Sequence, residues 1–103
     1  MSWVDVGSAA ALSEATPLSV EVDGLALVVV RCGNDLYAVE DRCTHDGESF
    51  EGADVDSCQL ICPRHGARFC LRTGEALTPP AYEPLRTYAA REENDRILVA
   101  QPE

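Results

Sequence analysis

Residues 43–66 read CTHDGESFEGADVDSCQLICPRHG, and this stretch decides how the rest of the chain is interpreted. It contains both histidines of the protein, His45 and His65, each beside a cysteine. Cys43 and His45 form a C-x-H group, Cys62 and His65 form a C-x2-H group, and residues 46–61 separate the two groups. Thiolates and imidazoles at such spacings are typical of metal ligands. Because the surrounding residues are polar and glycine-containing rather than core-like, the stretch predicts a metal site.

The order of these four residues narrows the kind of metal site. A Cys2His2 zinc site has the same ligand types, but it usually pairs like with like, as C-x2–4-C and H-x3–5-H. Here a cysteine and a histidine alternate within each group. This alternation suits a binuclear iron centre in which two thiolates bind one iron and two imidazoles bind the other. A structural zinc-binding module stays open as the alternative from a different class of protein, and metal analysis would separate the two.

Outward from this stretch, short apolar segments alternate with turn residues, which is typical of an all-β protein. We expect strands at residues 3–6, 18–22, 25–32, 36–39, 59–61, 67–70, 85–91 and 96–100. Asp23-Gly24 predicts a two-residue hairpin turn, and residues 8–16 predict a turn or a short helical piece. Residues 40–57 are acidic and predict a loop. We find no internal repeat.

The length of 103 residues predicts a single domain spanning residues 1–103. We expect an antiparallel β-sandwich scaffold built from residues 1–40 and 81–103. A small subdomain of about residues 41–80 would carry the metal site. The composition, 46% hydrophobic and 25% charged, is that of a globular domain.

The net charge of −10 excludes several classes of partner. An acidic protein does not bind nucleic acid or an anionic membrane through clustered Lys and Arg, so we expect neither partner. The longest apolar run, Leu25–Val30, is far shorter than a membrane span. The N-terminal residues lack the basic and apolar regions of a secretory signal, which predicts a cytoplasmic protein. In that compartment, five cysteines indicate metal or redox chemistry rather than a disulfide framework.

The chain resembles Rieske-type ferredoxins, and the resemblance covers nearly all of it. It is carried by the segments WVDV (3–6), LYAVEDRCTH (36–45), ICPRHGARF (61–69), RTGEAL (72–77) and TPPAYEPLRTY (78–88). The resemblance implies the Rieske iron–sulfur fold and one Rieske-type [2Fe–2S] cluster. It further implies that Cys43 and Cys62 bind the inner iron, that His45 and His65 bind the outer iron near solvent, and that Thr78–Ala81 form a third loop over the cluster.

The resemblance also implies a function. Ferredoxins of this family are one-electron carriers without catalytic activity, and they pass electrons from a reductase to a terminal oxygenase such as a ring-hydroxylating dioxygenase. We expect a monomer that meets these partners through its exposed histidine edge. The chain is no oxygenase itself, since no further histidine remains for a mononuclear iron site. Related small proteins leave two alternatives open: a ferredoxin of iron–sulfur cluster assembly, and the small subunit of assimilatory nitrite reductase.

Four positions depart from the high-potential members of the resembled family. Those proteins carry an additional cysteine in each ligand loop, joined by a disulfide, where this chain has Glu48 and Arg64. They also place a Ser and a Tyr hydroxyl near the cluster sulfurs, where this chain has Ala67 and Phe69. Fewer hydrogen-bond donors stabilise the reduced cluster less. We therefore expect a reduction potential toward the low end of the Rieske range of about −150 to +300 mV.

Three cysteines and four arginines remain to be assigned. We expect Cys32, Cys58 and Cys70 to be buried in the core, as free cysteines commonly are. The alternatives are a Cys58–Cys70 disulfide or a role in cluster assembly. For the arginines near the ligand loops, the alternatives are local ion pairs and a docking rim of mixed charge around the histidines. The arginines are Arg42, Arg64, Arg68 and Arg72, and their nearest acidic residues are Asp46, Glu48, Glu51 and Asp54.

Overall fold

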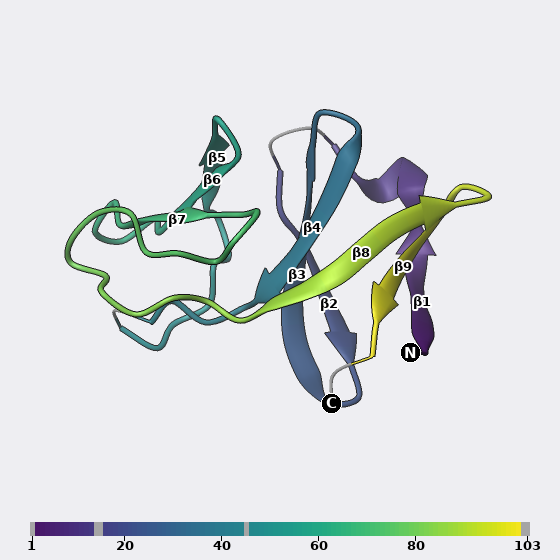
Figure 1. Ribbon diagram of the computed structural model, residues 1–103, viewed down its shortest axis with the longest axis horizontal. Coiled ribbons are helices and arrows are strands. Elements are labelled where there is room, and N and C mark those ends of the chain that lie inside the picture. Colours follow the sequence, from purple (N-terminus) through teal and green to yellow (C-terminus); the bar gives the residue numbers. More distant parts are fainter. Residues whose placement is uncertain (1, 14–15, 45, 102–103) are drawn as a thin grey trace.

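The computed structural model describes residues 2–13, 16–44 and 46–101, and these residues form two antiparallel sheets (Figure 1). The strands are β1 (Trp3–Ser8), β2 (Leu18–Val22), β3 (Leu25–Cys32), β4 (Asp35–Glu40), β5 (Asp54–Asp56), β6 (Gln59–Ile61), β7 (Arg68–Cys70), β8 (Thr87–Glu93) and β9 (Arg96–Ala100). A single 3-10 turn, η1 (Ala9–Ala11), follows β1. The all-β prediction is confirmed. No helix in the described residues has the length and apolar character to cross a membrane.

The larger sheet, here called the scaffold sheet, has the strand order β1-β9-β8-β4-β3-β2. Its two edge strands, β1 and β2, come into contact, so the sheet curls around an inner core. The second sheet, here called the small sheet, has the order β5-β6-β7 and lies beside the scaffold sheet with its loops at the left of Figure 1. Long loops connect it to β4 on one side and to β8 on the other.

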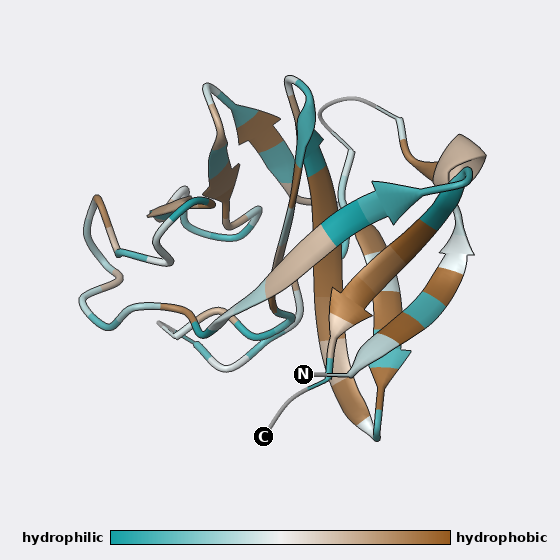
Figure 2. Ribbon diagram, turned by 45° about the vertical axis from the view of Figure 1, so that its right-hand side comes forward, coloured by the Kyte–Doolittle hydropathy of each residue, from teal (hydrophilic) through white to brown (hydrophobic). Residues whose placement is uncertain are grey.

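Strand β3 is buried on both faces and joins two hydrophobic cores. Leu27 and Val29 pack into the inner core of the curled sheet, whereas Val28 and Val30 pack against the small sheet. Successive side chains of a strand point to opposite faces, so a strand buried on both sides is apolar at every position. This explains the continuous apolar run in β3, seen as a brown ribbon in Figure 2. The small sheet therefore completes its core on the outer face of the scaffold.

Most predicted strands and turns are confirmed, and the hairpin between β2 and β3 is the clearest case. Asp23 and Gly24 have φ angles of 52° and 80°, and a two-residue turn with both φ values positive matches the twist of its flanking strands. At Gly74, φ is 80° and an added Cβ would lie 2.2 Å from the Leu85 carbonyl oxygen. Only glycine fits there, because the Leu85 N–H donates to the Gly74 carbonyl oxygen at 2.7 Å.

The prediction that residues 40–57 form only a loop is wrong at its end. Asp54–Asp56 form strand β5, which pairs with β6 through Val55 and Leu60 among others. The segment has one apolar side chain between two exposed aspartates, which gives a weak strand signal. It forms because its partner β6 supplies the ladder, and acidic side chains on an edge strand discourage pairing with other chains.

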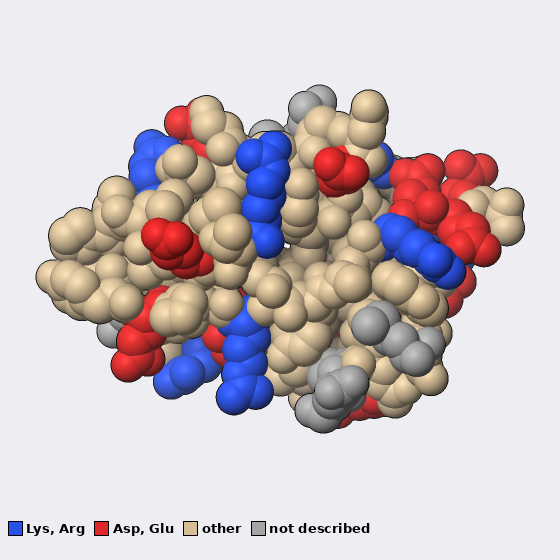
Figure 3. Space-filling view, in the orientation of Figure 1, with Lys and Arg blue, Asp and Glu red and all other residues tan. Residues whose placement is uncertain are grey.

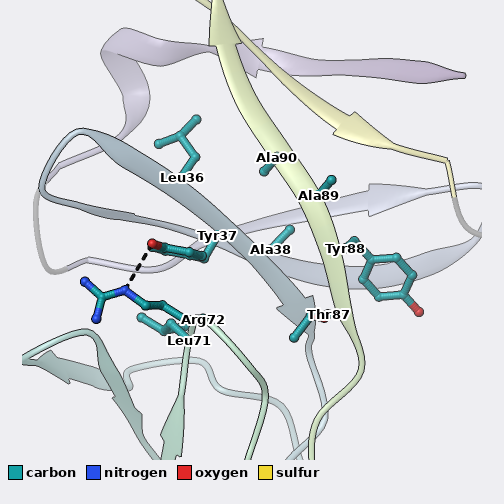
Figure 4. Close-up of a pocket in the computed structure, with 9 residues that line it drawn as sticks. All are labelled: Leu36, Tyr37, Ala38, Leu71, Arg72, Thr87, Tyr88, Ala89 and Ala90. Atoms are coloured by element: carbon teal, nitrogen blue, oxygen red, sulfur yellow. Dashed lines mark hydrogen bonds between the residues drawn. The ribbon is translucent and has the colours of Figure 1, made fainter. Parts of the chain in front are cut away.

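Two side-chain links within the described residues cross the boundary between the sheets, and the first of them lies beside a cavity of about 250 Å³ (Figure 4). Arg72, on the small-sheet side, donates from Nε to the Tyr37 hydroxyl of β4 at 3.3 Å. A disulfide joins Cys32, at the end of β3, to Cys58, in the turn between β5 and β6, with the Cα atoms 5.7 Å apart. That Cα separation lies within the usual range for a disulfide.

The expectations for the three remaining cysteines are thereby corrected. None is fully buried. The alternative Cys58–Cys70 disulfide is also wrong, since Cys58 is bonded to Cys32. Cys70 instead lies opposite Gln59 in the β6–β7 ladder, and its thiol interacts with Thr73. The cause is tertiary packing, which brings the β5–β6 turn against the end of β3 from 26 residues away.

Candidate metal centre

The first ligand loop, residues 43–48, follows β4 and is closed by two backbone hydrogen bonds. The Cys43 N–H donates to the Glu48 carbonyl oxygen at 2.8 Å, and the Gly47 N–H donates to the Cys43 carbonyl oxygen at 2.7 Å. Gly47 has φ of 76°, a left-handed conformation that glycine adopts without strain. Cys43 is thus fixed at the base of a tight turn, and its side chain is fully buried at 0% exposure.

The second ligand loop, residues 62–67, follows β6 and has the same construction. The Cys62 N–H donates to the Ala67 carbonyl oxygen at 2.8 Å, and the Gly66 N–H donates to the Cys62 carbonyl oxygen at 2.9 Å. Gly66 has φ of 73°, and Cys62 is 1% exposed. His65, by contrast, is exposed near the end of this loop. Each loop therefore holds a buried cysteine at its base by the same ring of hydrogen bonds.

The two loops bring the predicted cysteine ligands together. The sulfurs of Cys43 and Cys62 and a carboxylate oxygen of Asp46 lie within 4.8 Å of one another. His45 lies outside the described residues, so its predicted role as a ligand stays a prediction. Two buried cysteine sulfurs that face each other without a disulfide between them, beside an exposed histidine, fit a centre with one buried and one solvent-near metal.

An ion pair ties the two ligand loops to each other. Arg64 donates from Nε to Asp46 Oδ2 at 2.6 Å and from Nη2 to Asp46 Oδ1 at 3.2 Å. Its Nη1 donates to the Ser49 carbonyl oxygen at 2.9 Å. The hydrogen bond to Asp46 raises the pKa of Arg64 above its ordinary value. The expected local pairing is confirmed for this arginine, and a two-pronged contact of this kind fixes geometry as well as charge.

Arg68 and Arg72 have partners other than the acidic residues expected for them. Arg68 lies 3.4 Å from Asp56, at the end of β5, rather than beside an acidic residue of the first loop. Arg72 donates to Tyr37 and, from Nη2, to the Cys58 sulfur at 3.7 Å. Sequence reasoning missed both partners because they depend on β5 and on the docking of the small sheet against β4.

The proline-rich segment, residues 77–84, is hydrogen-bonded to the first ligand loop and to the residue that directly follows the second. The Thr44 hydroxyl of the first loop donates to the Glu83 carbonyl oxygen at 2.7 Å. The N–H of Arg68, directly after the second loop, donates to the Thr78 hydroxyl at 2.9 Å. The segment also carries the large apolar side chain that is most exposed in the described chain, Tyr82 at 81%. These contacts place the segment beside the ligand loops, and the role of Thr78–Ala81 as a loop over the cluster stays a prediction.

A third loop, residues 70–75, has the same construction. The Cys70 N–H donates to the Glu75 carbonyl oxygen at 2.9 Å, and the Gly74 N–H donates to the Cys70 carbonyl oxygen at 2.7 Å. The pKa of Cys70 is lowered, chiefly by a hydrogen bond from Thr73. The signal was present as three copies of C-x3-G, at residues 43–47, 62–66 and 70–74. The third copy has no histidine and stands apart from the predicted ligand set.

Known proteins share this sequence pattern and fold. A model of the Rieske [2Fe-2S] domain matches residues 2–89. The 3-phenylpropionate/cinnamic acid dioxygenase ferredoxin subunit of Shigella boydii serotype 4 (strain Sb227) is 41% identical over 78 residues, or 75% of this chain and 74% of that protein. The ferredoxin of carbazole 1,9a-dioxygenase from Nocardioides aromaticivorans IC177 superposes with a TM-score of 0.92 at 31% identity, covering 99% of this chain and 100% of that chain. A chain from a complex of reduced oxygenase and oxidized ferredoxin in carbazole 1,9a-dioxygenase gives 0.87 at 30% identity, covering 98% and 95%.

Proposed function

Because the chain belongs to the Rieske [2Fe–2S] domain family, we propose that Cys43, His45, Cys62 and His65 bind its cluster and that the protein passes electrons to the terminal oxygenase of a ring-hydroxylating dioxygenase. The chain is a Rieske ferredoxin, an electron carrier with one [2Fe–2S] cluster. When bound, the cluster supplies reversible one-electron chemistry. The assignment of the four ligands rests on the C-x-H and C-x2-H groups together with the paired loops.

The observation that carries the proposal is the division of each ligand loop into a buried base and an exposed end. Cys43 and Cys62 lie in the core shared with Phe69 and exclude water from the inner side of the site. His65 is exposed and gives a partner close access to the outer side. Neutral imidazoles in place of two thiolates also reduce the negative charge at the site, which raises the reduction potential above that of a four-cysteine centre.

The proposed docking face is the end of the molecule that carries His65 and the proline-rich segment. One relative is named as the ferredoxin subunit of a dioxygenase, and one similar chain comes from a complex of oxygenase and ferredoxin. By this likeness, a terminal oxygenase would cover His65 and contact the exposed side chains of Tyr82 and Leu77, which are 81% and 41% exposed. A reductase would supply the electron at the same edge, to a monomer in the cytoplasm.

One group of acidic side chains lies far from the proposed docking face. Glu92, Glu93 and Asp95 are exposed around the β8–β9 turn, at the right-hand end of the molecule in Figure 3. The ligand loops follow β4 and β6 at the other end of a molecule 38 Å long. Charge on the β8–β9 turn therefore contributes to solubility and long-range orientation rather than to direct contact with the proposed partner.

The test begins with the purified protein and its iron, zinc and acid-labile sulfide content. We expect two irons and two sulfides per chain and a visible spectrum that bleaches partly with dithionite; zinc without sulfide would overturn the proposed cluster.

Stopped-flow mixing of the reduced protein with a terminal oxygenase from the same organism then tests the proposed partner. We expect Tyr82→Ala to slow this oxidation several-fold without moving the potential, while Glu93→Gln at the far end has little effect. A reduced protein that the oxygenase does not oxidise would contradict the proposed partner.

A further inference from the structure

The Asp46–Arg64 pair lies directly beside the two buried cysteine sulfurs. A carboxylate oxygen of Asp46 is within 4.8 Å of the sulfurs of both Cys43 and Cys62. Arg64 contacts that carboxylate at 2.6 Å and 3.2 Å. The two side chains are only partly accessible, at 18% for Asp46 and 32% for Arg64. Solvent screening of their charges is therefore weaker than at a fully exposed surface.

The pair also links the two ligand loops through Arg64. From the second loop it reaches Asp46 and the Ser49 carbonyl oxygen on the side of the first loop. This ionic contact brings one negative and one positive charge to the edge of the site.

Charges so close to a redox centre act on it in opposite directions. Reduction adds one negative charge to the centre, which a neighbouring carboxylate disfavours and a neighbouring guanidinium favours. While the two are paired, their effects largely cancel. Replacing one partner removes its charge and leaves the charge of the other. Replacing Asp46 and replacing Arg64 should therefore shift the reduction potential in opposite directions, although either change breaks the same contact.

We propose that Asp46 and Arg64 are positioning residues that set the reduction potential of the bound cluster, with Asp46 lowering it and Arg64 raising it, while their contact holds the two ligand loops together. This inference rests on the proposed ligand set and deepens the proposed function. A single ion pair then both connects the two ligand loops and contributes to the reduction potential of the bound cluster. A purely mechanical role would make the two residues equivalent, since the loss of either breaks the same contact.

The experiment measures reduction potentials of the isolated cluster-loaded ferredoxin by dye-mediated titration, so it requires no partner protein. Against a fixed mediator, Asp46→Asn is expected to raise the equilibrium constant for reduction several-fold, and Arg64→Gln is expected to lower it several-fold. The double variant should fall between the two. Arg64→Lys keeps the charge but loses the two-pronged contact, so its potential should stay near that of the parent while it loses its cluster faster.

Matched controls come from the second ion pair of the small sheet. Arg68→Gln and Asp56→Asn make the same changes of net charge at a pair with side-chain exposures of 36% and 64%, and we expect much smaller shifts. Potentials of Asp46→Asn and Arg64→Gln that move in the same direction, or control shifts of equal size, would overturn the inference. Should Arg64→Gln lose its cluster, the upward shift of Asp46→Asn and the small shift of Arg64→Lys still decide the question. A parent protein without iron and sulfide would instead refute the proposed function.

Discussion

The scaffold sheet and the small sheet are held together in different ways. Strands of the scaffold sheet are five to eight residues long and surround an inner core of their own. Each strand of the small sheet has three residues, and its core is completed by Val28, Val30 and Val39 of the scaffold. A small antiparallel sheet needs a well-packed hydrophobic face to be stable, and here the scaffold supplies part of that packing. The small sheet therefore depends on the scaffold, whereas the scaffold has a core without it.

The same difference separates the part of the molecule that carries the candidate site from the part that supports it. The ligand loops lie outside the ladders of both sheets and are held by turn hydrogen bonds, one ion pair and the proline-rich segment. Functional groups on loops supported by a rigid framework are common, because loops vary freely while the framework keeps their positions. The candidate site is therefore carried by the part of the chain that we expect to unfold at the lowest denaturant concentration.

The largest effect is expected from emptying the core of the small sheet. Phe69 is fully buried, and its ring meets that of Phe50 edge to face, with centroids 5.7 Å apart. Phe69→Ala should lower the free energy of unfolding by about 3–5 kcal/mol through lost burial and a cavity. Visible absorbance should disappear at a lower urea concentration than the far-UV signal of the sheets, because the small sheet opens first.

Leu27→Ala is the matched truncation on the scaffold side. Leu27 is fully buried in the inner core, and its loss should cost about 2–5 kcal/mol. Here the visible and far-UV signals should vanish together, since the small sheet does not outlast the scaffold. If Phe69→Ala instead unfolded in one step by both probes, the two sheets would form a single cooperative unit and the comparison would fail.

A smaller effect is expected from the disulfide that joins the two sheets. The Cys32–Cys58 bond closes a segment with a sequence separation of 26, for which loop-closure entropy predicts about 3.5 kcal/mol. The double variant Cys32→Ser, Cys58→Ser should lose about this much stability and should no longer respond to dithiothreitol. Chemical denaturation with and without reductant measures both. Reducing compartments keep most thiols free. Whether this bond is formed in the cell therefore decides whether the protein has the stability of the oxidised or of the reduced form there.

Cys70→Ser serves as the control for that variant. Cys70 is not part of the disulfide, so this variant should keep the full response to dithiothreitol. Equal stability of the parent protein in oxidising and reducing buffer would show that the bond contributes nothing to the connection between the sheets.

The features that the sequence predicted correctly depend on interactions between residues close in the chain. Local patterns predicted the hairpin at Asp23-Gly24, the buried strand Leu25–Cys32 and the loops that begin at Cys43 and Cys62. Each of these depends on residues close in the chain. Hydrophobic periodicity and ligand spacing are visible without the fold.

What the sequence did not reveal depended on long-range contacts. Strand β5 pairs with β6 but has a single apolar side chain, so its sequence shows no hydrophobic periodicity. The Cys32–Cys58 bond requires the β5–β6 turn to dock on the end of β3, and Arg68 meets Asp56 only once β5 exists. The third C-x3-G loop was visible in the sequence, but its shared geometry emerges only from the hydrogen bonds of the folded chain.

The smallest effect is expected at the ion pair between the scaffold strands β1 and β9. Arg96 donates from Nε and Nη2 to the carboxylate of Asp5 at 2.9 Å and 3.0 Å, and this hydrogen bonding lowers the pKa of Asp5 below its ordinary value of 3.8. A lowered pKa means that the folded state binds the proton less readily than the unfolded state. The pair therefore stabilises the protein above that ordinary value, and its contribution is lost as the pH falls through the lower folded pKa.

Asp5→Asn should accordingly destabilise the protein slightly at pH 7 and leave it equal to the parent in strong acid, with denaturation curves at both pH values as the measurement. Both side chains of this pair are about half exposed, at 46% and 49%, against 18% and 32% for Asp46–Arg64. Salt screens exposed charges more strongly, so the effect of Asp5→Asn should vanish in about 1 M salt. The shift in potential of Asp46→Asn should largely persist there. Equal salt sensitivity of the two would mean that burial does not distinguish the ion pair of the scaffold from that of the ligand loops.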